Sequence, residues 1–226
     1  MDSFIGWIGG KKLLRKAICD RFPDKISKYV EVFGGAGWVL FYREKHAGFE
    51  VYNDINSHLV SLFRCIKYHP EAVSDEMKYL LNSREIFGCF KNQEFSGLTD
   101  IQKAARFLYL IKASYGSKFG TYGARPRNIG RSDVFKTKTV QKRLESVVIE
   151  NKSFEALIKQ YDSPDTLFYC DPPYYGSEKY YDTGDFVFNE SQHIALNRIL
   201  SGIKGRFVLS YNDCPFIREL YGEFSC

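Results

Sequence analysis

The tetrapeptide Asp171-Pro172-Pro173-Tyr174 combines side chains that could hold an amino group. Asp171 supplies a carboxylate acceptor, and Tyr174 supplies a flat aromatic face. The two prolines fix the backbone angle φ and lack N–H donors, so the turn presents carbonyl oxygens as acceptors. A planar ligand with an exocyclic amine would suit this arrangement. The alternative interpretation is a plain stop at the end of a strand.

A glycine-rich segment nearer the start could bind a cofactor. Phe33, Gly35 and Gly37 belong to F-G-G-A-G (33–37), at the junction of a predicted strand and a predicted helix. Glycine tolerates positive φ and lets the backbone approach a ligand closely. The segment is shorter than a dinucleotide-binding G-x-G-x-x-G motif, which favours a cofactor with a nucleoside but no phosphate. A structural turn is the alternative.

Two charged residues accompany these motifs. Asp54 follows the second predicted strand, 17 residues after Gly37, the position from which a carboxylate reaches ribose hydroxyls in nucleotide-binding folds. Lys11 ends G-W-I-G-G-K (6–11), which also contains Trp7, and the glycines would let its ammonium group reach a carboxylate. A frayed N-terminus is the alternative for this loop.

A parallel sheet would bring these residues together. Strand-like runs at 29–33, 49–53, 147–150, 166–170 and 206–211 alternate with helical patterns at 12–22, 38–46, 56–68, 154–160, 191–203 and 215–221. This alternation predicts an open α/β sheet with right-handed crossovers and helices on both faces. Ligands collect at the carboxyl ends of such strands, so the motifs should share one edge of the sheet.

The middle of the chain has a different character. Helical patterns at 71–81, 83–91 and 99–114 precede a glycine-rich, aromatic stretch (114–125) that reads as a β-hairpin or a mobile loop. Residues 112–143 include nine basic residues and one acidic residue, so this segment carries +8 while the rest of the chain carries −3. The modest net charge of +5 therefore conceals a strongly basic region, which could contact an acidic partner; a solvated basic face is the alternative.

Composition excludes several classes of protein. The chain has 226 residues, 44% of them hydrophobic and 26% charged, and lacks the run of about 20 apolar residues that a membrane-spanning helix needs. Its six cysteines form no C-x-x-C pair and do not cluster with the four histidines, so zinc-site spacing is absent. The start of the sequence does not resemble a signal peptide. We expect reduced thiols, no metal and a cytoplasmic location.

The ordered motifs resemble the Dam-type N6-adenine DNA methyltransferases, which use S-adenosylmethionine (AdoMet). The resemblance covers nearly the whole chain: W-I-G-G-K (7–11), F-x-G-x-G (33–37), Y-N-D-I-N (52–56), an insertion and D-P-P-Y (171–174). It implies a Rossmann-like α/β methyltransferase fold with an inserted, mostly helical DNA-recognition domain and a β-hairpin. The catalytic domain would comprise residues 1–57 and 141–226, and the recognition domain residues 58–140.

The resemblance also implies roles for individual residues. The cofactor-binding residues would be Trp7, Lys11, Phe33, Gly35, Gly37, Asp54 and Asp171, and the catalytic residues Asp171, Pro172, Pro173 and Tyr174. In the basic segment, the DNA-binding residues would be Tyr115, Ser117, Lys118, Tyr122, Arg125, Arg127 and Arg131. His193 is expected to start a helix or to pack in the core.

The implied reaction is transfer of the AdoMet methyl group to N6 of a flipped-out adenine in double-stranded DNA, leaving S-adenosylhomocysteine. One alternative is cytosine-N4 methylation, which more often accompanies S-P-P-Y, and another is a catalytically inactive or truncated DNA-binding relative. Thr121 stands where the N-G-L-x-R-x-N pattern of GATC-specific members places Arg, so we do not expect GATC specificity. A restriction endonuclease of the same system is a candidate partner.

Family members usually continue into a final antiparallel β-hairpin. The chain ends at Cys226, soon after the last predicted helix. We therefore expect either a truncated form or a sheet with one uncovered edge, which is a recognised hazard for association.

Overall fold

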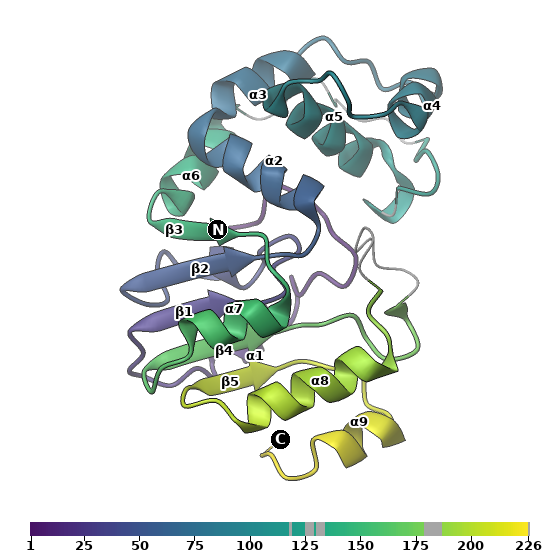
Figure 1. Ribbon diagram of the computed structural model, residues 1–226. Helices are drawn as coiled ribbons and strands as arrows, with labels where there is room; N and C mark the ends of the chain where they lie inside the picture. The colour runs from purple at the N-terminus through teal and green to yellow at the C-terminus, as the bar shows by residue number, and fades with distance from the viewer. Residues whose placement is uncertain (118, 125–128, 130–133, 179–186, 226) are drawn as a thin grey trace.

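Parallel strands form the centre of the computed structural model, which describes residues 1–117, 119–124, 129, 134–178 and 187–225, with backbone only for 117 and 134–137 (Figure 1). The strands are β1 (Lys28–Glu31), β2 (Phe49–Asn53), β3 (Val147–Glu150), β4 (Thr166–Cys170) and β5 (Arg206–Leu209). In the described chain they form one five-stranded sheet in the order β3-β2-β1-β4-β5, every pair parallel. The predicted α/β fold with a parallel sheet is confirmed.

Side chains alternate between the two faces of the sheet, as the two-residue period of a strand requires. Tyr29 of β1 and Tyr52 of β2 enter one core, whereas their neighbours Val30 and Val51 enter the other. On the first face, α2 (Ser57–Tyr68) stacks Phe63 on Tyr52, and α5 (Asp100–Ala113) packs on α2. The helices on the second face include α7 (Phe154–Tyr161), α8 (Glu190–Ser201) and α9 (Pro215–Leu220). The sheet is therefore buried on both faces.

The insertion forms a helical layer next to the β3 edge of the sheet (Figure 1). It contains α3 (Pro70–Met77), α4 (Arg84–Asn92) and α5, and α6 (Val134–Leu144) leads back to β3. Residue 140 lies inside α6, so a domain boundary there would divide a continuous helix.

The loop after α5 approaches a hairpin without forming one. It contains the 3-10 turn η2 (Tyr115–Ser117) and closes through one antiparallel bridge between Ser114 and Tyr122. The Tyr115 N–H donates to the Thr121 carbonyl at 2.8 Å, and the Gly123 N–H donates to the Ala113 carbonyl at 2.7 Å. In the described residues the expected β-hairpin is thus a single-bridge loop.

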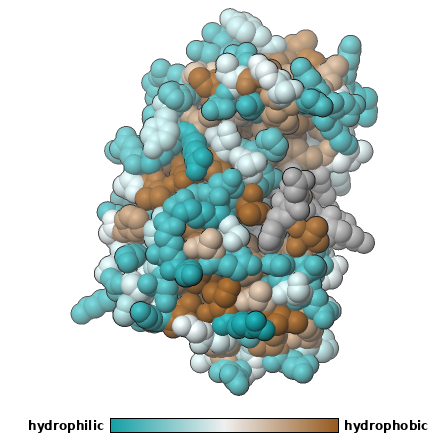
Figure 2. Space-filling view, in the orientation of Figure 1, coloured by the Kyte–Doolittle hydropathy of each residue, from teal (hydrophilic) through white to brown (hydrophobic). Residues whose placement is uncertain are grey.

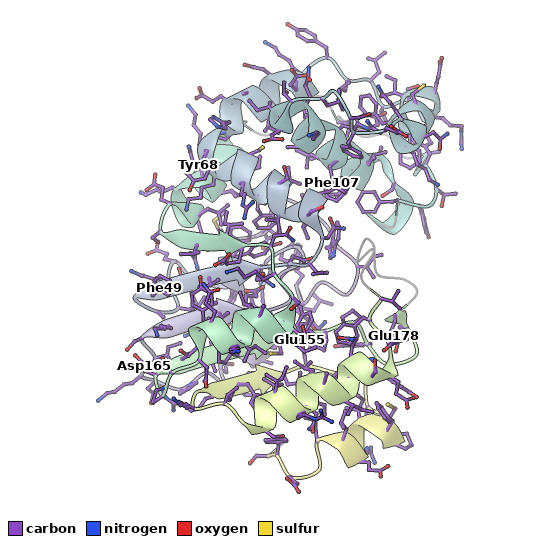
Figure 3. The ribbon with its side chains drawn as sticks, viewed as in Figure 1. Phe49, Tyr68, Phe107, Glu155, Asp165 and Glu178 are labelled. Atoms are coloured by element: carbon purple, nitrogen blue, oxygen red, sulfur yellow. The ribbon has the colours of Figure 1, made fainter. Side chains whose placement is uncertain are left out.

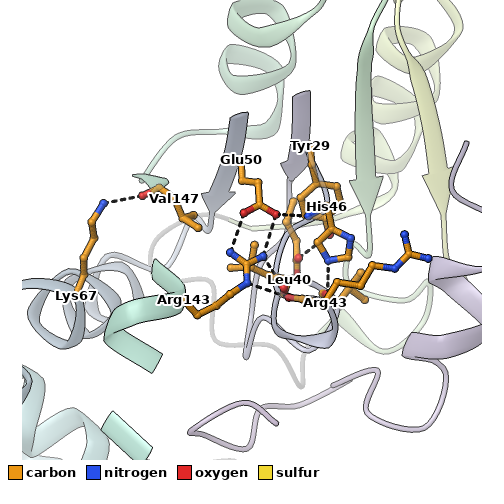
Figure 4. A network of polar contacts seen from close by, with 10 residues as sticks. Tyr29, Leu40, Arg43, His46, Glu50, Lys67, Arg143 and Val147 are labelled. Atoms are coloured by element: carbon orange, nitrogen blue, oxygen red, sulfur yellow. Dashed lines mark hydrogen bonds and ion pairs between the residues drawn. The ribbon is translucent and has the colours of Figure 1, made fainter. Parts of the chain in front are cut away.

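Two predicted helices are shorter than expected. The pattern at 12–22 gives only α1 (Arg15–Cys19), and the pattern at 38–46 gives only the 3-10 turn η1 (Leu40–Tyr42). The second prediction fails because side chains occupy the carbonyls that a helix would use: Arg143 donates to Leu40 and Arg43 (2.8 and 3.0 Å), and His46 Nε2 lies 2.8 Å from the Val39 carbonyl oxygen (Figure 4).

The same contacts bury one basic residue of segment 112–143. Arg143 forms a bidentate ion pair with Glu50 of β2, at 2.7 and 2.9 Å, and the two side chains are 5% and 1% exposed (Figure 4). Arg143 therefore joins α6 to the sheet instead of facing solvent. Lys138, five positions earlier in α6, pairs at the surface with Glu71 at 2.9 Å.

Hydrophilic side chains cover much of the visible surface, with hydrophobic ones between them (Figure 2). Val187 and Ile194 are among the exposed apolar residues. No helix in the described part of the chain is both long enough and apolar enough to cross a membrane.

Candidate active site

A pocket of about 650 Å³, which includes space open to solvent, lies at the carboxyl ends of β1, β2 and β4. The predicted site residues that line it are Trp7, Lys11, Phe33, Gly35, Asp54, Asp171 and Pro173. They come from segments that the sequence separates widely, and the parallel strands bring them to one edge. Gly37 lies behind the pocket, where a Cβ would be 3.1 Å from the Phe41 ring.

Asp171 lies between two donors. Lys11 Nζ is 2.6 Å from Oδ2, and the Ser210 hydroxyl donates to Oδ1 at 2.7 Å. Burial raises the pKa of Asp171, and the nearby Lys11 ammonium and the Ser210 hydrogen bond act in the opposite direction. Lys11 Nζ also donates to the Gly9 carbonyl at 2.7 Å. The carboxylate is therefore fixed in orientation and has a cation beside it.

The rest of the tetrapeptide surrounds this carboxylate. Pro172 and Pro173 are buried, and Tyr174 is half-buried. The ring of Tyr174 has Lys11 Nζ 4.7 Å from its centroid and the Tyr211 ring at 6.1 Å. An aromatic face, a carboxylate and a cation are therefore neighbours, as the sequence predicted for the first two.

The glycine turn after β1 depends on the absence of side chains. Gly35 and Gly37 have φ of +49° and +68°, values that favour glycine. A Cβ on Gly34 would be 2.2 Å from the Tyr52 ring, and one on Gly35 would be 3.0 Å from Trp7 Cδ1. At Gly34 the backbone therefore approaches the Tyr52 ring more closely than a residue with a side chain allows, and at Gly35 a side chain would be both crowded by Trp7 and strained by the positive φ.

Asp54 is held by backbone donors on both oxygens. Gly35 N–H donates to Oδ2 at 2.8 Å, and Asn56 N–H donates to Oδ1 at 2.8 Å. Asn56 in turn caps α2, accepting from the Leu59 N–H at 3.0 Å. The start of α2 and the glycine turn thus position the carboxylate at the pocket wall.

Sequence reasoning missed two polar residues of the site, Glu31 and Ser210. Glu31 lines the pocket, is 2% exposed and accepts a hydrogen bond from the Tyr29 hydroxyl at 2.7 Å. Its burial raises its pKa to about 8. Glu31 ends β1 and Ser210 follows β5 directly, so the rule that ligands meet strand ends could have found both.

A second, smaller hollow adjoins the first. It measures about 310 Å³ and shares Phe33, Ile55 and Pro173 with the main pocket. The Phe33 ring packs against the rings of Phe154 and Phe188, each at 5.8 Å. Aromatic faces therefore continue the pocket beside the acid Asp54.

The predicted DNA-binding residues are only partly described. Tyr115 is exposed, whereas Tyr122 is half-buried and its hydroxyl donates to Asn82 Oδ1 at 2.8 Å. The residues Lys118, Arg125, Arg127 and Arg131 and the side chain of Ser117 lie outside the described part. Next to them, Phe119 packs on Phe107 and on Trp7 of the pocket, at 5.1 and 5.7 Å.

No group of three or more His, Cys, Asp or Glu side chains could hold a metal ion within the described residues.

A parallel sheet with a glycine turn after β1, an acid after β2 and D-P-P-Y after β4 defines a Rossmann-like methyltransferase. The chain belongs to the D12 class N6 adenine-specific DNA methyltransferases, whose family model matches residues 7–226. It is accordingly an adenine-specific DNA methyltransferase of an AdoMet-using family, and the predicted resemblance is confirmed.

Relatives with assigned names agree with the family. The chain is 25% identical over 232 residues to the Type II methyltransferase M.CviBI of Paramecium bursaria Chlorella virus NC1A, covering 99% of this chain and 88% of that protein. It is 26% identical over 239 residues to the Retron Ec67 DNA adenine methylase of Escherichia coli, covering 100% and 82%. It is 27% identical over 245 residues to the DNA adenine methylase of Haemophilus influenzae, covering 96% and 82%.

Proposed function

We propose that the chain transfers the AdoMet methyl group to N6 of a flipped-out adenine at specific sites in double-stranded DNA, leaving S-adenosylhomocysteine. The observation that carries this proposal is the Asp171 carboxylate, held by Lys11 and Ser210 at the pocket edge beside the Tyr174 ring. Catalytic roles for Asp171, Pro172, Pro173 and Tyr174 belong to the same proposal.

The chemistry of the pocket fits AdoMet. Lys11 is a cation suited to the methionine carboxylate, and the buried Glu31 is an acceptor for the ammonium group. Asp54 suits the ribose hydroxyls, and the rings of Phe33 and Phe154 suit the adenine ring. When bound, AdoMet supplies a methyl group on a sulfonium centre, which is a strong electrophile. We also propose that Trp7, Gly35 and Gly37 shape this cofactor pocket. The proposed reaction requires no metal ion.

The residues of the tetrapeptide must make an adenine amine reactive. Its lone pair is delocalised into the ring, so N6 is a weak nucleophile. The two N6–H groups would donate hydrogen bonds to the Asp171 carboxylate and the Pro172 carbonyl. These hydrogen bonds would favour a pyramidal nitrogen whose lone pair is free to react. Fixed acceptors and correct placement are the main sources of acceleration in such a site. N6 attacks the methyl carbon as the C–S bond breaks, so Asp171 is not required as a base before transfer. The N–H proton becomes acidic only afterwards, when it can leave to the Asp171 carboxylate or to solvent.

The target base must leave the DNA helix to reach this pocket. Base flipping costs a few kcal/mol, and stacking on the Tyr174 face would recover part of that energy. We propose that residues 58–140 form the DNA-recognition region and that Tyr115, Ser117, Lys118, Tyr122, Arg125, Arg127 and Arg131 contact DNA. Arg143 is excluded from this surface by its burial against Glu50.

Incubation with isotopically labelled AdoMet and duplex DNA tests the proposal. Label should appear on adenine N6, and label only on cytosine N4 or on RNA would refute it. Calorimetry with AdoMet completes the test. The inactive alternative predicts that the protein binds AdoMet and DNA but transfers no label to the DNA.

We further propose a role beside a restriction endonuclease, supported by the Type II names of relatives. Sequencing DNA from cells that express the chain should show methylated adenines in one short sequence. Protection of that sequence from a cognate endonuclease would support the role, and methylation without a common sequence would contradict it.

A further inference from the structure

Three polar side chains near Tyr174 form a hydrogen-bonded chain whose middle member is buried and whose two ends are partly exposed. His193 of α8 is 0% exposed; its Nε2 is 3.1 Å from Glu178 Oε1, and its Nδ1 shares a hydrogen bond with the Tyr211 hydroxyl. Glu178 belongs to the loop that follows D-P-P-Y, and Figure 3 shows it beside the N-terminal end of α8. Tyr211 follows β5. The mechanism proposed above uses none of the three.

The partners of His193 determine its tautomer. A carboxylate only accepts hydrogen bonds, so Nε2 carries the proton toward Glu178 and Nδ1 accepts from the Tyr211 hydroxyl. Burial lowers the pKa of His193, opposed in part by Glu178 and Glu190. The lowered pKa favours the neutral ring, and the two hydrogen bonds orient it with Nε2 as donor and Nδ1 as acceptor. A packed core histidine, the role expected from the sequence, also needs partners for its ring nitrogens, so it is the connection of those partners to Tyr174 that suggests a further role.

Each end of this chain reaches the tetrapeptide. At one end, Glu178 Oε1 also accepts from the Gly176 N–H at 2.9 Å, in the turn where the Ser177 N–H donates to the Tyr174 carbonyl at 2.9 Å. At the other end, the Tyr211 ring lies 6.1 Å from the Tyr174 ring, centroid to centroid. The backbone after Tyr174 and its aromatic neighbour are therefore fixed by the same histidine.

We propose that Glu178, His193 and Tyr211 form a positioning relay that orients the Tyr174 ring to stack on the flipped adenine. The inference rests on the proposed function of Tyr174 as the stacking face. None of the three lines the proposed cofactor pocket, and we assign them as positioning residues that act through Tyr174.

Tyr211→Phe tests the relay, because it keeps the ring and removes only the hydroxyl that reaches His193. The single-turnover methylation rate should fall about tenfold, the typical effect of losing one buried hydrogen bond, with AdoMet and DNA affinities within about twofold of wild type. Tyr221→Phe is the matched control: the Tyr221 hydroxyl is buried without a hydrogen-bond partner in the described chain, and its ring lies 5.8 Å from Tyr211. The control should react at the wild-type rate.

A double-mutant cycle shows whether the relay acts through Tyr174. In a Tyr174→Ala background, Tyr211→Phe should cause no further loss of rate, because the side chain being oriented is gone. Equal losses in the two backgrounds would instead indicate a general structural effect and would overturn the relay.

Fluorine NMR of protein labelled with 3-fluorotyrosine provides a readout that does not require activity. The Tyr174 resonance, assigned by its disappearance in Tyr174→Phe, should move in Tyr211→Phe and stay in place in Tyr221→Phe. An unmoved resonance with an unchanged rate would overturn the relay. If the Tyr174 resonance moves in Tyr211→Phe but the wild-type protein does not methylate adenine, the proposed function is refuted and the positioning of Tyr174 by these residues is retained.

Discussion

Lys11 and Asp171, 160 positions apart in the sequence, form an ion pair with Nζ 2.6 Å from Oδ2. The pair joins the loop before α1 to the loop after β4. One cation thus stands beside the proposed catalytic carboxylate and at the wall of the proposed cofactor pocket. A change in either residue should therefore affect both AdoMet binding and the methyl-transfer rate, which calorimetry and single-turnover kinetics measure separately.

Replacement of Asp171 should remove methylation and leave DNA binding intact. Asp171→Ala deletes the fixed acceptor for N6–H, and loss of one preorganised group of this kind reduces rates by about 10²- to 10³-fold. Single-turnover rates and DNA-binding titrations measure the two effects. Asp20→Ala, which removes an exposed carboxylate paired with Lys16, is the control. Near-normal turnover in Asp171→Ala would remove the proposed catalytic role.

Replacement of Lys11 should shift the pH dependence of the reaction. Lys11 is the largest influence that lowers the pKa of Asp171 against the effect of burial. In Lys11→Met that pKa rises, so the carboxylate is protonated at higher pH and the acid limb of the rate profile moves upward. Single-turnover rates measured at saturating AdoMet over a range of pH locate the acid limb of the profile. Lys12→Met, whose ammonium group pairs with Asp2 at the surface, should show the wild-type limb.

A methyl group on Gly35 should weaken cofactor binding. Gly35→Ala places a Cβ 3.0 Å from Trp7 Cδ1 at a φ of +49°, which costs roughly 1–2 kcal/mol for a residue with a side chain. We expect AdoMet affinity to fall about tenfold by calorimetry, the equivalent of 1.4 kcal/mol. Gly88→Ala, with no atom within 4 Å of the new Cβ and a position inside α4, should bind normally. Equal affinities in the two variants would contradict the close packing at Gly35.

The buried acid Glu31 should make stability depend on pH. Its pKa is about 8 in the folded chain against an ordinary value of 4.5, so between these values the folded state holds a proton that the unfolded state releases. This contribution to stability is complete below pH 4.5 and is lost as pH rises through about 8. Urea unfolding at pH 5 and at pH 8 gives the free energy of unfolding of Glu31→Gln and of wild type. The variant's value relative to wild type should increase between the two pH values. A difference that is the same at both pH values would show that the proton is not retained.

The buried pair of Arg143 and Glu50 should contribute strongly to stability. Arg143→Met leaves the Glu50 carboxylate buried without its cation, and breaking such a pair costs about 3–5 kcal/mol. Urea unfolding measures the free energy of unfolding. Lys138→Met, on the same helix but at the surface, should stay close to wild type. A similar loss in both variants would contradict a special role for the buried pair.

Local sequence signals were enough for most of the sheet. The strand-like runs at 49–53, 147–150 and 166–170 match β2, β3 and β4 residue for residue, because each is bounded by turn or charged residues. The helix predicted at 38–46 failed because its carbonyls bind Arg143, a partner about 100 residues away that no local pattern reveals.

The site shows the same division. Asp54 and Asp171 stood out because each follows a clear strand, and the structure brings both to one pocket. Ser210 and His193 were not assigned to a site because a hydroxyl after an apolar strand and a histidine in a helix are common. Their meaning depends on Asp171 and Glu178, which only the fold places beside them.

The central position of β1 has a consequence for synthesis of the chain. Lys28 of β1 is in register with Phe49 of β2 on one side and with Thr166 of β4 on the other, 138 positions later. At about 5–20 residues per second, a ribosome needs roughly 7 to 30 seconds to produce that second neighbour. During this interval one edge of β1 lacks its partner and could pair with another chain. The half of the sheet that holds the glycine turn can form early, whereas the pocket is completed only when D-P-P-Y emerges.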